Sequence, residues 1–201
     1  LLYTPVTNFF GSDTLTLLLS DKGLSGDGGE LQATGEINIT LNSVNDAPII
    51  TNPLPLTIDE DSTQIFSTAA TTLISIVDVD IADSILTLTL SVNDGTLKLA
   101  STDNIIISSG ADQSATMIIK GILSDINTAL DGLLYTSDSQ YNGTSTITIT
   151  ANDGGAAGSG GARETIATLD VTVTALNDAP VIALPAPPTI DEDTSVTFSI
   201  A

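Results

Sequence analysis

An internal repeat constrains this chain more than any other feature of its sequence. The tetrapeptide Asn-Asp-Ala-Pro at 45–48 returns at 177–180, a separation of 177 − 45 = 132 residues. About 28 of the 69 positions that overlap at this offset are identical without a gap, which chance does not produce. The chain therefore divides into the end of one module (1–44), one complete module (45–176) and the start of a third (177–201). We expect it to be a piece of a longer tandem array.

Within the complete module, apolar residues alternate with polar ones at a period of two. Leu or Ile alternates with Thr over 85–90 and 146–150, and 168–173 continues the pattern. This period is typical of half-buried β-strands. About seven such strands in one module predict an all-β, Greek-key immunoglobulin- or cadherin-like sandwich. The residues expected in its core are Phe66, Leu86, Leu88, Leu90, Ile147, Ile149 and Val171.

Glycine-rich turns separate the predicted strands. Asn93-Asp94-Gly95 lies between two apolar stretches and predicts a β-hairpin. The glycine-rich stretch 152–161 predicts a second hairpin between the last two strands.

One segment breaks the strand pattern and predicts a short crossover helix over 124–131. Ser124 is a candidate N-cap, Ile126 and Leu130 are spaced as on one helical face, and Gly132 follows. We expect the apolar face of this helix to pack onto the sandwich.

Composition excludes several classes of function. The chain carries 25 acidic and 4 basic residues, a net charge of −21, so we expect no nucleic-acid partner and no attraction to anionic membranes. Hydrophobic residues make up 41% of the chain, which is enough for a core. Cys and His are absent, which removes thiolate and imidazole catalysis. No apolar run is long enough to cross a bilayer, so we expect no membrane insertion in this segment.

Acidic and amide side chains gather at equivalent positions of each module. Asp78 and Asp80 alternate along an extended segment, so their side chains point the same way and can hold one ion. Hard oxygen ligands in this number suit Ca²⁺, which takes six to eight of them. The candidate ligands are Asp21, Asn45, Asp46, Asp59, Glu60, Asp61, Asp78, Asp80, Asp83, Asp153, Asn177, Asp178 and Glu192. A plain linker at 45–48 and a solvated acidic surface are the alternatives.

The combined motif resembles a known family. Ser43–Pro48, Asp59–Ser62, Asp78–Asp80, the stretch 121–135 and Tyr141–Gly143 together look like the cadherin-like repeats of giant bacterial cell-surface and type I-secreted adhesins. The resemblance covers essentially the whole chain. It implies secreted, extracellular sandwiches strung into a stalk, often stiffened by Ca²⁺ between neighbouring repeats. The Asp-Arg-Glu motif of animal cadherins does not occur here, so the resemblance does not extend to their three-ion junction.

Three non-catalytic functions remain open. A stalk or spacer of a cell-surface adhesin is favoured by the repeat. A subunit of a self-assembling filament or surface layer is the second, and a glycan- or protein-binding module is the third, although 3% aromatic residues and no Trp offer few sugar-stacking surfaces. A hydrolase with two carboxylates is disfavoured, because the acidic pairs recur at homologous joints and not in one pocket.

The incomplete modules at the two ends pose a folding problem. Residues 1–44 match only the last strands of a module, and 178–201 match only the first. Neither piece can bury both faces of a sandwich alone, so we expect a longer chain or a segment of another copy to cover the open face. That face is expected to include Leu15, Leu17, Leu19, Ile37, Ile39 and Leu41.

Overall fold

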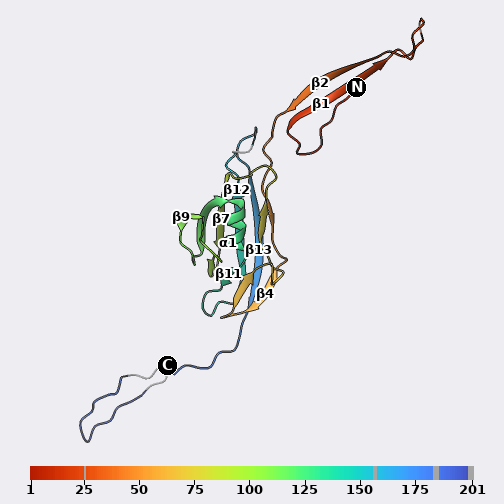
Figure 1. The fold of residues 1–201 in the computed structure, drawn as a ribbon. Helices are drawn as coiled ribbons and strands as arrows, with labels where there is room; N and C mark the ends of the chain where they lie inside the picture. Colours follow the sequence, from red (N-terminus) through yellow and green to blue (C-terminus); the bar gives the residue numbers. More distant parts are fainter. Residues whose placement is uncertain (25, 156–157, 183–185, 199–201) are drawn as a thin grey trace.

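The chain forms a β-hairpin, a β-sandwich and an extended C-terminal segment, arranged in that order in the computed structural model (Figure 1). The structure describes residues 1–24, 26–155, 158–182 and 186–198. Among the described residues, no helix is both long and apolar enough to span a membrane.

The hairpin is a structural copy of the last two strands of the sandwich. Strands β1 (Gly11–Ser20) and β2 (Gln32–Leu41) pair antiparallel, with Gly11 opposite Leu41. Strands β12 (Gly143–Asn152) and β13 (Glu164–Thr174) pair in the same register, with Gly143 opposite Val173. Each pair of partners is offset by 132 residues, so the sequence repeat is also a repeat of structure.

The complete module contains a six-stranded sheet, a three-stranded sheet and a two-stranded sheet. The six-stranded sheet has the order β4 (Leu56–Asp59), β13, β12, β7 (Ile85–Val92), β10 (Thr116–Ile122), β9 (Ile106–Gly110). The three-stranded sheet has the order β5 (Thr63–Phe66), β11 (Leu133–Thr136), β8 (Thr96–Lys98), and β3 (Ile49–Thr51) pairs with β6 (Ser75–Val77). Neighbouring strands are antiparallel except β13 and β4, which are parallel.

One hydrophobic core joins these sheets, and it confirms the sandwich predicted from the alternation. The seven predicted core side chains are all fully buried: Phe66, Leu86, Leu88, Leu90, Ile147, Ile149 and Val171. Because side chains on a strand alternate between its two faces, burial of every second residue of β7 places Thr87 and Thr89 on the other face of the sheet.

The predicted crossover helix is present as α1 (Leu123–Leu130), which connects β10 to β11. It packs Ile126 and Leu130 into the core, as expected. Ser124 is not its N-cap, contrary to the prediction: Ile122 occupies that position and makes no side-chain capping bond. The helix starts earlier because β10 runs directly into it, so no separate capping residue intervenes.

The predicted hairpin at Asn93-Asp94-Gly95 is wrong. The turn is present, and Gly95 has a φ of 100°, but β7 and β8 on either side of it belong to different sheets. The chain reverses and also changes layer, because β8 pairs with β11 rather than with β7. The predicted hairpin around 152–161 is confirmed by the pairing of β12 and β13.

The two ends of the chain leave apolar side chains exposed. In β1 and β2, Leu17, Leu19 and Ile37 are exposed, while the other three residues of the expected open face are half-buried. Beyond β13, the described residues of 177–198 contain no helix or strand. Ile190 and Phe198 are exposed in this segment.

Candidate cation site at the module junction

Asn45 fastens the incoming linker to the sandwich. Its side chain is buried, and its Nδ2 donates to Asp153 Oδ2 at 2.7 Å and to the Gly161 carbonyl at 3.0 Å. The Arg163 side chain donates through Nε to the Asn45 carbonyl at 2.8 Å. The linker is therefore tied to the loop between β12 and β13, which limits how freely the preceding segment can swing.

Asp153 holds that loop closed. Its Oδ1 accepts the Gly155 and Arg163 N–H groups, both at 2.8 Å. Asp21, its repeat equivalent, does the same in the first hairpin, where its Oδ1 accepts the Gly23 and Leu31 N–H groups at 2.9 Å. These bonds favour the ionised acid and lower the pKa of Asp21. Hydrogen bonds to backbone N–H groups therefore give Asp153 and Asp21 a structural role in their loops without an ion. The prediction that these two acids bind an ion stays untested.

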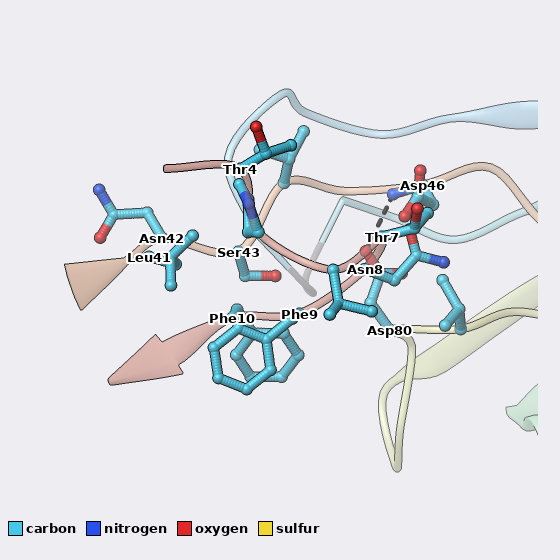
Figure 2. A pocket seen from close by; sticks show the side chains of 14 residues that line it. Thr4, Thr7, Asn8, Phe9, Phe10, Leu41, Asn42, Ser43, Asp46 and Asp80 are labelled. Carbon is cyan, nitrogen blue, oxygen red and sulfur yellow. Dashed lines mark hydrogen bonds between the residues drawn. The ribbon is translucent and has the colours of Figure 1, made fainter. Parts of the chain in front are cut away.

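A pair of acids lies beside the linker at the same end of the sandwich. Asp80 Oδ2 accepts the Asp46 backbone N–H at 2.9 Å (Figure 2). Asp78 Oδ1 accepts the N–H groups of Asp80 and Ile81, both at 3.2 Å. The other two oxygens, Asp78 Oδ2 and Asp80 Oδ1, are shielded from solvent and have no hydrogen-bond partner. Buried carboxylate oxygens without donors are costly to maintain unless a cation or a proton compensates them.

The environment of this pair raises the pKa of Asp78. The pKa of Asp78 is raised above its ordinary value, first because burial penalises the charged form and then because the Asp80 carboxylate is close enough to share its proton. The repulsion between the two ionised carboxylates also raises it. A bound divalent cation would oppose this effect, because it favours the ionised form of Asp78.

A cavity of ≈ 360 Å³ opens next to these acids, between the N-terminal segment and the linker (Figure 2). Asn8, Asp46 and Asp80 line it together with Phe9 and Phe10. A neighbouring hollow is lined by Asn8, Asp46 and Asp78. Asp46, Asp78 and Asp80 of the complete module therefore line the same hollows as Asn8 of the preceding module.

Asn8 is the junction residue that the sequence alone did not identify. It has a φ of 61°, a backbone conformation that Asn adopts more readily than most residues. Its repeat equivalent, Gln140, has a φ of 59°, so the same turn recurs in the complete module. An amide residue recurring at this offset, three residues before the first residue of β1 or β12, was the available signal.

A second group of predicted residues lies at the opposite end of the sandwich. Glu60 is buried, and its Oε1 accepts the Leu176 N–H at 2.6 Å. The Glu60 N–H donates to the Thr174 carbonyl at 2.9 Å, and Thr174 Oγ1 donates to Asp59 Oδ1 at 2.7 Å. Glu60 thus anchors the outgoing linker, as Asn45 anchors the incoming one.

The structure brings only some of the predicted ligands together. Asn45, Asp46, Asp78, Asp80 and Asp153 lie at the entry of the module. The remaining predicted ligands lie elsewhere: Asp59, Glu60 and Asp61 at its exit, Asp21 in the hairpin, Asp83 exposed after β6, and Asn177, Asp178 and Glu192 exposed in the C-terminal segment. Among the described residues, no three acidic side chains converge closely enough to form a metal site by themselves. Any ion at the entry would need ligands other than carboxylates as well.

Comparison with known proteins adds little. No protein-family model matches the chain, and no curated protein matches it. Among solved structures it is similar to the crystal structure of human mucin-like protocadherin EC1-2, at 16% identity over 83% of this chain and 85% of that chain, with a TM-score of 0.32. A likeness this low carries no argument about function. The assignment to an all-β sandwich rests on the sheets and core of the chain itself.

Proposed function

We propose that this chain is a non-catalytic stalk or spacer segment of an extracellular adhesin, stiffened by Ca²⁺ at its module junctions. The repeat supports the role of a stalk or spacer, because similar modules in series extend a chain without adding a new active centre. The anchored linkers support stiffness at the module junctions, because Asn45 and Glu60 tie the incoming and outgoing linkers to the body of the sandwich.

One observation carries the calcium proposal: Asp78 and Asp80 keep two shielded oxygens without donors beside Asp46. The Asp78 and Asp80 carboxylates are the ligands that this module would supply. Asn8 would add an amide oxygen from the preceding module, so the ion would connect two modules. When bound, Ca²⁺ neutralises the acids and restricts the junction.

The arrangement of the acids supports a role without catalysis. Asp78, Asp153 and Glu60 each accept backbone N–H groups, so they organise loops and linkers. The absence of His and Cys removes the usual bases and nucleophiles of hydrolytic sites.

The test is a calcium titration by isothermal calorimetry, followed by thermal melting in EGTA and in calcium. We expect a dissociation constant of about 10⁻⁶ to 10⁻³ M, in the range of sensor and extracellular sites. Calcium at 100 times that constant should add about 2.7 kcal/mol of stability. The variant Asp80→Asn should bind at least about tenfold more weakly, a loss of about 1.4 kcal/mol.

The matched control is Asp103→Asn, which removes the same charge from an exposed loop. It should bind calcium as the parent chain does. The proposal fails if about 10 mM calcium neither releases heat nor raises the melting temperature. It fails equally if Asp80→Asn and Asp103→Asn bind alike, because the acids would then act only through net charge.

A further inference from the structure

We propose that the outward face of the six-stranded sheet is an interface between two copies of this chain, which pack side by side through the same face. The face belongs to the complete module, and it lies on the side of the sheet away from the hydrophobic core. The inference goes beyond the role of a stalk, and it does not depend on calcium binding.

The face carries little charge. Strands β7, β10, β12 and β13, which the structure describes in full, alternate buried side chains with outward ones. The outward side chains include only three charged residues: Lys120, Glu164 and Asp170. Their charges sum to 1 − 2 = −1, whereas the whole chain carries −21. A strongly acidic chain repels its own copies, and on this face that repulsion is small.

Apolar and β-branched side chains fill the rest of the face. Most of the outward residues are Thr. Isoleucines stand among them: Ile106 in β9 is 66% exposed and Ile166 in β13 is 61% exposed, while Ile118 in β10 is half-buried. Covering such side chains is favourable by about 25 cal/mol per Å² of apolar surface. The face therefore gains from contact with a second surface.

The pairing of the strands arranges the outward residues in rows across the sheet. One row, running from β13 to β10, contains Glu164, Asn152, Thr87 and Lys120. The next row along the strands contains Ile166, Thr150, Thr89 and Ile118. Lys120 and Glu164 lie at opposite ends of the first row, three strand spacings or about 14 Å apart, which is too far for an ion pair within one copy.

These rows are complementary to themselves under a two-fold axis. The centre of the order β4-β13-β12-β7-β10-β9 lies between β12 and β7. A two-fold axis that runs along the strands at this centre, midway between two stacked sheets, places β10 of one copy over β13 of the other. Lys120 then faces Glu164 of the second copy, and the same ion pair forms again across the axis. Ile118 faces Ile166 of the second copy in the same way.

The dimensions of the sheet allow this packing. Aligned sheets stack about 10 Å apart, a gap that a lysine and a glutamate side chain bridge together. Six strands about 4.8 Å apart, each with about seven residues at about 3.3 Å, give a face of roughly 600 Å². Two such faces bury roughly 1,200 Å², the lower limit of specific interfaces. We therefore expect a weak dimer, with a dissociation constant between about 10 µM and 1 mM.

The axis also determines how the two copies are oriented. Strand β12 runs along the sandwich and ends next to Asp153, which binds Asn45 at the entry of the module (Figure 1). Because the axis runs along the strands, both copies have their entries at the same end. The contact therefore joins neighbours that point in the same direction, and it leaves the ends of each copy free.

Reversal of the ion pair tests the interface by sedimentation equilibrium in EGTA at about 0.15 M salt, where exposed charges more than about 8 Å apart are largely screened. The parent should dimerise as its concentration rises to about 1 mM. Lys120→Glu should weaken dimerisation at least about tenfold, because it places like charges opposite each other. Glu164→Lys should do the same. The double variant should dimerise within about twofold of the parent, because the pair is restored in reverse.

The matched control is Lys98→Glu, which makes the same change of charge at an exposed position of β8, in the three-stranded sheet. It should dimerise within about twofold of the parent. A parent that stays monomeric up to about 1 mM would overturn the proposal. So would a double variant as weak as the single ones, or a loss in Lys98→Glu equal to that in Lys120→Glu.

Cross-linking provides a second arm, because the chain contains no Cys. A chain with Ile118→Cys is mixed with a chain with Ile166→Cys and treated with a thiol cross-linker that spans about 10 Å. The mixture should give linked dimers. Either variant alone should give at least about tenfold fewer, because two copies of one residue lie on opposite sides of the axis. Equal yields from the mixture and from the single variants, or no linked dimer in the mixture, would contradict the proposal.

Discussion

Replacing Asn45 with Ala should loosen the linker and destabilise the complete module. The substitution removes the donor to Asp153 Oδ2 at 2.7 Å and the donor to the Gly161 carbonyl at 3.0 Å. Asp153 is only 1% exposed, so water cannot simply replace the lost donor. A hydrogen bond to a charged group contributes about 1.5–3 kcal/mol and one to a neutral carbonyl about 0.5–1.5 kcal/mol.

The sum is a loss of roughly 2–4.5 kcal/mol in the free energy of unfolding. For a domain of about 130 residues, this corresponds to a fall of roughly 6–18 °C in melting temperature. Differential scanning calorimetry or circular dichroism measures the transition directly. The repeat itself provides the control, since Asn177 is the equivalent of Asn45 and is exposed.

Asn177→Ala should therefore leave the melting temperature of the module unchanged to within about 0.5 kcal/mol. If Asn45→Ala is as stable as Asn177→Ala, the Asn of the linker does not anchor it, and the account of the module entry is refuted. A double variant with Asp153→Asn would show whether the two residues act together, because their effects should then not add.

Two further predictions concern the acidic pair and the sheet-changing turn. In EGTA, Asp78→Asn should gain stability relative to the parent as pH rises from the ordinary pKa of 3.8 through the raised native pKa of Asp78, because only the parent must then ionise a shielded acid. Urea unfolding at several pH values measures this difference in stability. A difference that is independent of pH, or of opposite sign, would contradict the prediction. Gly95→Ala should cost about 2–4 kcal/mol of stability, because its φ is 100° and a Cβ would lie 2.2 Å from the Thr136 carbonyl oxygen. Gly154→Ala is the control: its φ is 70° and the nearest atom to its Cβ would be 3.8 Å away, so it should cost only about 1 kcal/mol. Thermal melting measures both losses, and equal losses would contradict the steric explanation.

The parts of the fold that follow from periodicity were predictable from sequence. Alternation of Leu with Thr in β7 determines which face is buried, because successive side chains on a strand point to opposite faces. The helix α1 was predictable for a similar reason, since Ile126 and Leu130 are four residues apart. Neither inference needs knowledge of distant contacts.

The parts that depend on distant contacts were not predictable. The turn chemistry of Asn93-Asp94-Gly95 specifies a reversal, but not which sheet receives the next strand. Likewise, the sequence shows an acid at position 153 but not the donors that surround it, so its role in holding the loop was not predictable. Asn8 was missed because its closeness to Asp46 and Asp78 arises only when the two modules meet.

The central claim, that calcium stiffens the junction, is tested most directly by a distance distribution across it. Spin labels on Thr34→Cys in the hairpin and Thr172→Cys in the sandwich would be the only two thiols in the chain, and dilution with unlabelled chain limits contributions from neighbouring copies. We predict a broad distribution in EGTA that narrows when calcium is added, and no narrowing when Asp80→Asn is also present. A distribution of the same width with and without calcium would contradict the account.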